Sequence, residues 1–224
     1  MMAPPNVPHV MAWRHPRPVG AEGRCIGRTN LPVDRRKAKR LAHRIRRAAR
    51  QHGWPRVVHT SSLQRCAAVG RQLRHWGWRH HIHDDLLEMD FGAWDGLCWS
   101  QIAHADVDAW CQDFAHHAPG GGESLNAMLQ RVACSLARLS THASRHQAAP
   151  STSSPHAAGH DDNASVPVLI VAHAGWILSA RWVVRHTAAP THAGEWPPAP
   201  RYGEPCAWSA TSLQYRPVEP ASRR

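Results

Sequence analysis

Two histidines far apart in the sequence follow the same kind of segment. His15 follows the apolar run Val10–Trp13, with Arg14 between them, and His173 follows the run Val168–Ala172. Short apolar runs of this kind predict buried strands of a parallel sheet. Ligands of open α/β sheets bind at the carboxyl ends of the strands. Two imidazoles at that edge, one directly after an arginine, indicate chemistry on an anion.

A third strand end carries groups of the same kind. The strand predicted at Arg56–Thr60 leads into the letters SSLQR, which place Arg65 in the first turn of the next helix. A helix that begins after His173 would present free backbone N–H groups, which suit a phosphate. The planar guanidinium of arginine binds phosphate oxygens in pairs. Together with Arg14 and His15, these groups predict a site for a phosphoryl group.

Five segments resemble those of the histidine phosphatase superfamily, which includes the cofactor-dependent phosphoglycerate mutases, and they come in the family's order. They are RHP at Arg14–Pro16, SSLQRC at Ser61–Cys66, LLEMDFGAWDG at Leu86–Gly96, GGGES at Gly120–Ser124 and VLIVAHAG at Val168–Gly175. A bare Arg-His pair is common, but five segments in the right order are specific. The resemblance covers residues 10–184 and implies a phosphoglycerate mutase-like fold.

The resemblance implies a phosphomonoesterase that works through a phosphohistidine and needs no metal and no cofactor, because arginines supply the positive charge. His15 would be the nucleophile, and its neutral form would be favoured by the surrounding cations. Arg14, Arg65 and His173 would bind the phosphoryl oxygens and stabilise charge during transfer. Glu88 would be the general acid and then the base that activates water. The other carboxylates near it in the sequence are Asp85, Asp90 and Asp95.

The loop after the first histidine bears on the substrate. The segment Arg14–Val33 resembles the RHP…G-x-C-x-G-x-x-D-x-P-L form of α-ribazole phosphatases, with Pro16, Cys25 and Gly27 in place. Asn30 stands where that form has Asp. The resemblance therefore implies hydrolysis of α-ribazole 5′-phosphate, a small phosphomonoester, in cobalamin synthesis.

Two alternatives stay open. One is a broad-specificity or sugar-phosphate phosphatase; the short segment Leu97–Pro119 favours a phosphatase over a mutase. The other is an inactive phosphate-binding or nucleic-acid-binding protein. The presence of His15, Arg65, Glu88 and His173 together argues against the second alternative.

The formal net charge of +11 has a local origin. Much of it lies in residues 35–50, where apolar residues recur at helical spacing and predict an amphipathic helix. We interpret its cations as the solvated outer face of that helix. Nucleic acid is the less favoured partner, because no zinc-finger, RNP-like or recognition-helix pattern accompanies the charge.

Strand and helix patterns alternate, which predicts a single α/β domain over residues 1–224, a three-layer αβα sandwich with a mainly parallel central sheet. The predicted strands are Val10–Trp13, Arg56–Thr60, Ile82–Asp84, Pro167–Ala172 and Ala207–Tyr215. The predicted helices are Asp34–Gly53, Leu63–Trp76, Ser124–His142 and Trp176–His186, with one or two short helices in residues 86–118. Residues 143–165 have no apolar periodicity and predict a disordered insertion, and residues 217–224 predict a loose tail.

Composition restricts the setting of the protein. No apolar run is long enough to span a bilayer, and no secretory signal is evident, so we expect a cytoplasmic protein without a membrane partner. Six scattered cysteines predict reduced core residues. The HHIH segment at His80–His83 lacks a metal-ligand pattern, so we expect no metal there. Trp94 and Trp99, which flank the Glu88 segment, are candidates for lining a pocket.

Overall fold

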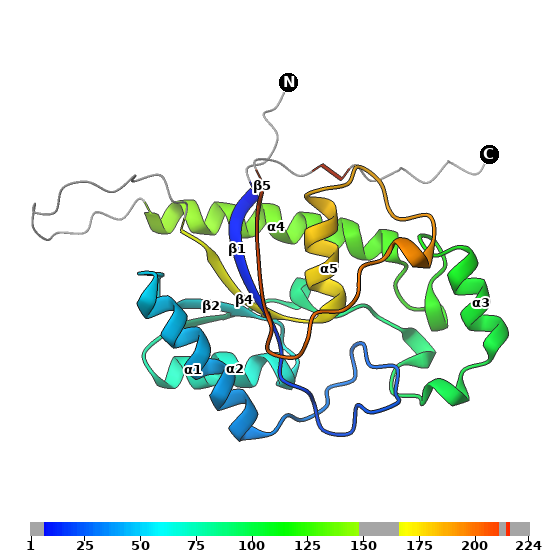
Figure 1. The fold of residues 1–224 in the computed structure, drawn as a ribbon, viewed down its shortest axis with the longest axis horizontal. Coiled ribbons are helices and arrows are strands. Elements are labelled where there is room, and N and C mark those ends of the chain that lie inside the picture. The colour runs from blue at the N-terminus through cyan, green and yellow to red at the C-terminus, as the bar shows by residue number, and fades with distance from the viewer. Residues whose placement is uncertain (1–6, 148–165, 211–213, 216–224) are drawn as a thin grey trace, which may run out of the picture.

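The fold is built around a five-stranded sheet. The structure is a computed structural model that describes residues 7–147, 166–210 and 214–215. The strand order is β3-β2-β4-β1-β5 (Figure 1). The strands are β1 (Val7–Arg14), β2 (Val57–Thr60), β3 (Arg79–Ile82), β4 (Val168–Ala172) and β5 (Pro205–Ala210). All neighbours pair in parallel except β1 and β5, which are antiparallel. The prediction of a mainly parallel sheet is therefore confirmed.

Helices cover both faces of the sheet. The long helices are α1 (Arg35–Gln51), α2 (Gln64–His75), α4 (Leu125–Gln147) and α5 (Ala174–Val183), and α3 (His104–Gln112) lies beyond the sheet (Figure 1). Alternate residues of β1 point to opposite sides: Val10 and Ala12 pack with α4 and α5, whereas Trp13 packs with α1 and α2. The three-layer arrangement follows from this alternation, because each face of the sheet presents an apolar surface.

The start of α1 follows directly from the sequence. The Asp34 side chain accepts hydrogen bonds from the backbone N–H groups of Arg36 and Lys37, as expected of an N-cap. The predicted end is close to the observed one: Gly53, which has a φ of +66°, follows shortly after the last turn. A stripe of apolar residues faces the sheet: Ala38, Leu41, Ala42, Ile45 and Ala49.

Three strands differ from their predicted bounds by two or more residues. β1 begins at Val7, three residues before the predicted Val10, and pairs there with β5. β3 begins three residues earlier than the predicted Ile82–Asp84, because Arg79–Ile82 pairs with β2 as an exposed edge strand that needs no apolar pattern. β5 begins at Pro205 rather than Ala207 and reaches Ala210, whereas the predicted residues 211–213 lie outside the described part.

Two helices also differ. α5 begins at Ala174, directly after His173, and ends at Val183 instead of His186. α4 continues to Gln147, so residues 143–147 of the predicted disordered insertion are helical and that part of the prediction was wrong. The rest of that insertion and the predicted loose tail lie outside the described residues.

The structure also bears on membrane-spanning segments and on the cysteines. Across the described residues, no helix is long and apolar enough to cross a membrane. The cysteines are all free, and Cys25, Cys66 and Cys206 are buried as expected. Cys111 and Cys134 are exposed, so the expectation that all six belong to the core was wrong.

Candidate active site

The two histidines of the sequence analysis lie side by side at the carboxyl end of the sheet. β1 pairs with β4, with Arg14 opposite Ala172, and the backbone N–H of His15 donates to the carbonyl of Ala172 at 3.0 Å. The His15 and His173 ring centroids are therefore only 5.0 Å apart. The prediction that the fold brings these two imidazoles together is confirmed.

His15 is held as a neutral base with one free nitrogen. Its Nδ1 lies 2.8 Å from the carbonyl oxygen of Pro16, and because a carbonyl only accepts, Nδ1 carries the proton. Nε2 is then the unprotonated nitrogen. Burial, and after it the charges of Arg65 and Arg14, hold the pKa of His15 well below its ordinary value. This combination gives a nucleophilic imidazole at neutral pH.

His173 connects two other residues of the site. The Nε of Arg65 donates to His173 Nδ1 at 3.2 Å, so the proton of the neutral ring is on Nε2, which donates to Ser61 Oγ at 2.7 Å. The ring is fully buried, and burial together with the Arg65 charge lowers its pKa well below the ordinary value. Both ring nitrogens are engaged by the protein here, and the phosphate contact of His173 stays a prediction.

Arg65 is fixed by a loop that precedes α1. Its Nη1 and Nη2 donate to the carbonyl oxygens of Thr29 and Gly27. Asp95 holds that loop in turn, because its carboxylate accepts from Gly27 N at 3.1 Å and from Thr29 Oγ1 at 2.6 Å. Asp95 therefore positions the loop whose carbonyl groups hold Arg65.

Arg14 is held on its two sides by the segment before β5. Its Nη1 donates to the carbonyl of Pro200 at 2.7 Å, and its guanidinium lies 3.9 Å from the centre of the Tyr202 ring. The Nε is buried and has no hydrogen-bond partner among the described residues. Tyr202 also lies against His15, with ring centroids 5.6 Å apart. The sequence contains no local signal for Tyr202, because its contacts with Arg14 and His15 form only when the chain folds back to the site before β5.

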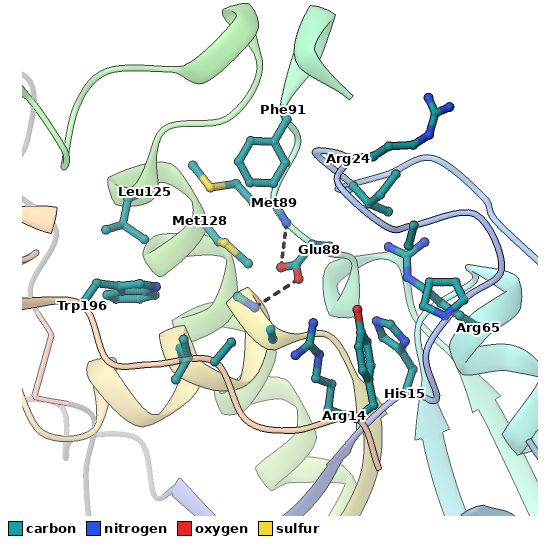
Figure 2. A pocket seen from close by; sticks show the side chains of 18 of the residues that line it. Arg14, His15, Arg24, Arg65, Glu88, Met89, Phe91, Leu125, Met128 and Trp196 are labelled. Carbon is teal, nitrogen blue, oxygen red and sulfur yellow. Dashed lines mark hydrogen bonds between the residues drawn. The ribbon is translucent and has the colours of Figure 1, made fainter. Parts of the chain in front are cut away.

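Glu88 lies opposite the arginines and is almost fully buried. Its Oε1 accepts from the N–H of Met89 and its Oε2 from the N–H of Gly175, both at 3.1 Å (Figure 2). A Cβ atom on Gly175 would lie 2.3 Å from Oε1, so any larger residue at this position would displace the Glu88 carboxylate. The nearby carboxylates Asp85 and Asp90 are paired with Arg138 and Arg28 and do not line the cavity.

Arg14, His15, Arg65 and Glu88 form one end of a cavity of about 390 Å³. His173 is fully buried behind them and does not line this cavity. Figure 2 shows Arg14, His15 and Arg65 on one side of Glu88, and Leu125 and Trp196 on the other. The far part of the cavity is apolar and is lined by Met89, Phe91, Trp110, Phe114, Leu125, Met128 and Trp196.

Sequence reasoning found only part of that lining. Trp99 lines the cavity as predicted, but Trp94 does not, because it is buried in a separate cluster with Cys25 and Ile102. Trp110 and Trp196 were missed. They come from short elements whose positions no periodic pattern specifies.

The described residues contain no group of three or more His, Cys, Asp or Glu side chains that could hold a metal ion. His81 and His83 do share one side of the sheet edge, where both stack against His59. The expectation that the HHIH segment binds no metal stays a prediction.

The lowered pKa values predict how stability depends on pH. An unfolded histidine takes up a proton near pH 6.5, whereas the folded His15 and His173 remain neutral, so the unfolded chain binds more protons below that pH. The free energy of unfolding is therefore fully retained above pH 6.5. It should fall by about 1 kcal/mol per pH unit for each such histidine as the pH decreases towards the folded pKa. His80, whose pKa burial lowers to about 4, adds a smaller contribution because it is partly exposed.

Denaturant unfolding at several pH values between about 7 and 5 measures this slope. In a His15→Asn variant, the slope of the unfolding free energy against pH should decrease by the contribution of one buried histidine. Replacing the exposed His104 by Asn should leave this slope unchanged. A free energy of unfolding that stays constant over this range would contradict the assignment of neutral buried rings.

Comparison with known proteins agrees with this geometry. The family model of the histidine phosphatase superfamily (branch 1) matches residues 10–196. The adenosylcobalamin/alpha-ribazole phosphatase of Escherichia coli is 39% identical over 62 residues, which are 26% of this chain and 30% of that protein. The chain spans 15% of the length of the mycobacterial curated relatives that it matches.

Two solved structures are similar over most of the chain. The α-ribazole phosphatase of Shigella flexneri has a TM-score of 0.62 at 21% identity, covering 95% of this chain and 100% of that one. A mycobacterial glucosyl-3-phosphoglycerate phosphatase has a TM-score of 0.60 at 25% identity, covering 78% of each chain. These likenesses and the family match confirm the phosphoglycerate mutase-like fold. The chain belongs to the histidine phosphatase superfamily.

Proposed function

We propose that the chain hydrolyses a phosphomonoester through a phosphohistidine on His15, and that this substrate is α-ribazole 5′-phosphate. The observation that carries the proposal is the cavity, in which a nucleophilic imidazole and two arginines lie at one end and aromatic side chains at the other. A substrate that joins a phosphate to an apolar aromatic group fits both ends.

In the first step, Nε2 of His15 attacks phosphorus in line with the leaving oxygen. The phosphorus–oxygen ester bond breaks, and protonated Glu88 gives its proton to the leaving alkoxide. In the second step the Glu88 carboxylate takes a proton from water, whose oxygen attacks phosphorus and breaks the phosphorus–nitrogen bond. Inorganic phosphate leaves, and both His15 and Glu88 return to their starting states.

Positive charge at the phosphoryl group comes from two fixed arginines. Arg14 has a buried Nε–H without a partner among the described residues, and buried donors are normally satisfied. A phosphoryl oxygen would supply that partner. Arg65 is held by backbone carbonyls and by His173, so little reorganisation is needed when charge develops in the transition state. These arginines make a metal ion unnecessary for charge stabilisation, so activity should survive chelation.

The apolar end supports an aromatic leaving group. Burial of an aromatic ring is favourable in proportion to its apolar area, and stacked rings add to that gain. In α-ribazole 5′-phosphate the ribose carries a benzimidazole, which would enter the part lined by Trp110, Phe114 and Trp196. The Escherichia coli relative is named as an adenosylcobalamin/alpha-ribazole phosphatase, which supports this substrate. Such a metabolite belongs to cobalamin synthesis in the cytoplasm, where we place the enzyme.

A sugar-phosphate substrate with a second anionic group is the other candidate. Arg24 lines the cavity near its mouth, and its guanidinium could pair with a carboxylate such as that of glucosyl-3-phosphoglycerate. The mycobacterial phosphatase of similar fold is named for that compound. The apolar lining favours the aromatic substrate instead, because a sugar would leave its hydroxyl groups beside partners that cannot form hydrogen bonds.

The substrate assignment predicts that the benzimidazole of the substrate has a large effect on kcat/KM. The kcat/KM for α-ribazole 5′-phosphate should exceed that for ribose 5-phosphate by about 10- to 100-fold, the value of burying one aromatic ring. Initial rates with both compounds and with glucosyl-3-phosphoglycerate measure the preference. Trp110→Ala should reduce the ratio while changing ribose 5-phosphate hydrolysis little. Equal values for the two ribose compounds, or a preference for glucosyl-3-phosphoglycerate, would contradict the assignment.

A further inference from the structure

The excess positive charge of the protein lies in one continuous segment. Residues 35–83 contain 14 of the 27 Lys and Arg residues and none of the 16 acidic residues. In the rest of the chain the acidic residues outnumber the 13 remaining cations. The positive net charge of the molecule therefore comes from residues 35–83 alone. The rest of the chain is slightly acidic.

The fold gathers these cations on one side of the sheet. α1 and α2 lie side by side on the same face, where both pack against Trp13 and Leu169 (Figure 1). α1 carries nine Lys or Arg residues, eight of them exposed, and Arg71 and Arg74 of α2 are exposed as well. Within the described residues, no ion pair joins any of these cations to an acidic group. The surface thus has a strong and uncompensated positive potential.

A second cavity interrupts this surface, at the end of α1. It measures about 480 Å³ and is lined by Arg46, Arg50, Arg56, Trp54, Trp76 and Trp78. The Arg46 guanidinium lies 5.2 Å from the centre of the Trp76 ring. Trp54 and Trp76 are half-buried and so remain partly accessible, and the exposed rings of His52 and His43 lie against them with centroids 4.8 and 4.4 Å apart. This combination of three arginines with three indoles differs from the solvated helix face expected from the sequence.

The position of the second cavity separates it from the reaction. Trp54 and Arg56 precede β2, and Trp76 and Trp78 precede β3, so the cavity lies at the amino ends of these strands. His15 and His173 follow the carboxyl ends of β1 and β4. A ligand in the second cavity would therefore occupy the opposite edge of the sheet from the active site.

From this arrangement we propose that the α1–α2 surface binds single-stranded nucleic acid, with phosphates on the exposed cations and an unpaired base in the cavity of Arg46 and Trp76. Sequence-tolerant binding of single strands combines a cationic surface that follows the backbone with aromatic side chains that stack on bases. A duplex would meet the cations but could not place a paired base against recessed indoles. Anionic membranes fit less well, because the exposed face of α1 is polar and offers no large apolar side chain for insertion.

The proposal goes beyond the phosphatase activity and is independent of it. The second cavity lies at the amino ends of the strands and the active site at their carboxyl ends. The full chain should therefore bind a single strand and the substrate at the same time. The two proposals can therefore fail separately.

Fluorescence anisotropy of a short fluorescein-labelled oligothymidylate, titrated with the full chain in a series of KCl concentrations, tests the proposal. We expect binding at low salt that weakens steeply as KCl increases. The triple variant Arg46→Gln, Arg50→Gln, Arg56→Gln should make the slope of log affinity against log salt shallower by about 2, since each phosphate contact on a single strand contributes about 0.7. Hydrolysis of p-nitrophenyl phosphate should remain unchanged in this variant.

Matched variants separate a site from general charge. Arg50→Gln and Arg185→Gln each remove one exposed cation, and only Arg50→Gln should weaken oligothymidylate binding clearly. Trp76→Leu should weaken single-strand binding at least about fivefold but leave binding of a duplex of equal length unchanged, as expected of base stacking. The unchanged phosphatase rate serves as the folding control.

Three results would overturn the proposal. They are equal losses in Arg50→Gln and Arg185→Gln, duplex binding as tight as single-strand binding, and competition by phosphatidylserine vesicles that exceeds competition by unlabelled oligothymidylate. Failure to bind at low salt would overturn it as well and would leave the phosphatase proposal untouched.

Discussion

Replacing His15 by alanine is expected to lower kcat by at least about 10⁴-fold for every phosphomonoester, because the covalent route through the imidazole is lost. The side chain is small relative to the cavity that it borders, so the fold should be retained. Rapid quench with labelled substrate should trap phosphate on His15 in the native protein. That phosphate should be labile in acid and stable in base.

Exposed His104 on α3 provides the matched control. His104→Ala should retain the native turnover and the native yield of labelled protein. Substantial activity in His15→Ala, or label on another residue of the native protein, would exclude the proposed nucleophile.

Glu88→Gln should have the second largest effect, and the effect should depend on the leaving group. An alkoxide needs a proton in the transition state, whereas nitrophenolate is already stable as an anion. The first step with an alkyl phosphate should therefore slow by about 10²- to 10⁴-fold, the usual range for general acid catalysis. The burst with p-nitrophenyl phosphate should slow far less. Single-turnover measurements isolate this step from the later activation of water.

Two further variants distinguish the acid from its neighbours. Gly175→Ala should reproduce the leaving-group dependence in weaker form, because the added Cβ would displace the Glu88 carboxylate. Asp90→Asn removes a carboxylate two residues away that pairs with Arg28 and does not line the cavity, so it should leave the burst unchanged. Equal slowing of both substrates in Glu88→Gln would rule out its role as the acid.

The reacting groups could be predicted because they are local features of strand ends. His15 and His173 each follow a short apolar run, and Arg65 opens a helix, so the rule that parallel strands end at one edge is enough to bring them together. The apolar stripe of α1 and its N-cap Asp34 were predictable for the same reason. The helical spacing of apolar residues and the capping side chain both lie within one short segment of the sequence.

The partners of those groups could not be predicted in this way. The contacts of Arg65 with Thr29 and of Arg14 with Tyr202 join residues that are distant in the sequence and lie on irregular segments. No periodic pattern specifies where such segments return. The same holds for Trp110 and Trp196, which turn a phosphate site into a cavity with an aromatic end. β3 was misplaced because an exposed edge strand rich in histidine and arginine lacks the apolar signal of the central strands.

The pairing of β1 with β4 also determines which motions the reacting centre can tolerate. Both imidazoles follow neighbouring interior strands of the sheet, and the backbone N–H of His15 donates to the carbonyl of Ala172, just before His173. Openings at β3 or β5, the two margins of the sheet, leave that pair intact. Separating the imidazoles requires breaking the parallel ladder between β1 and β4 in the interior of the sheet. Fraying at the sheet margins should therefore leave the two imidazoles together, whereas opening at β5 would release the segment that holds Arg14.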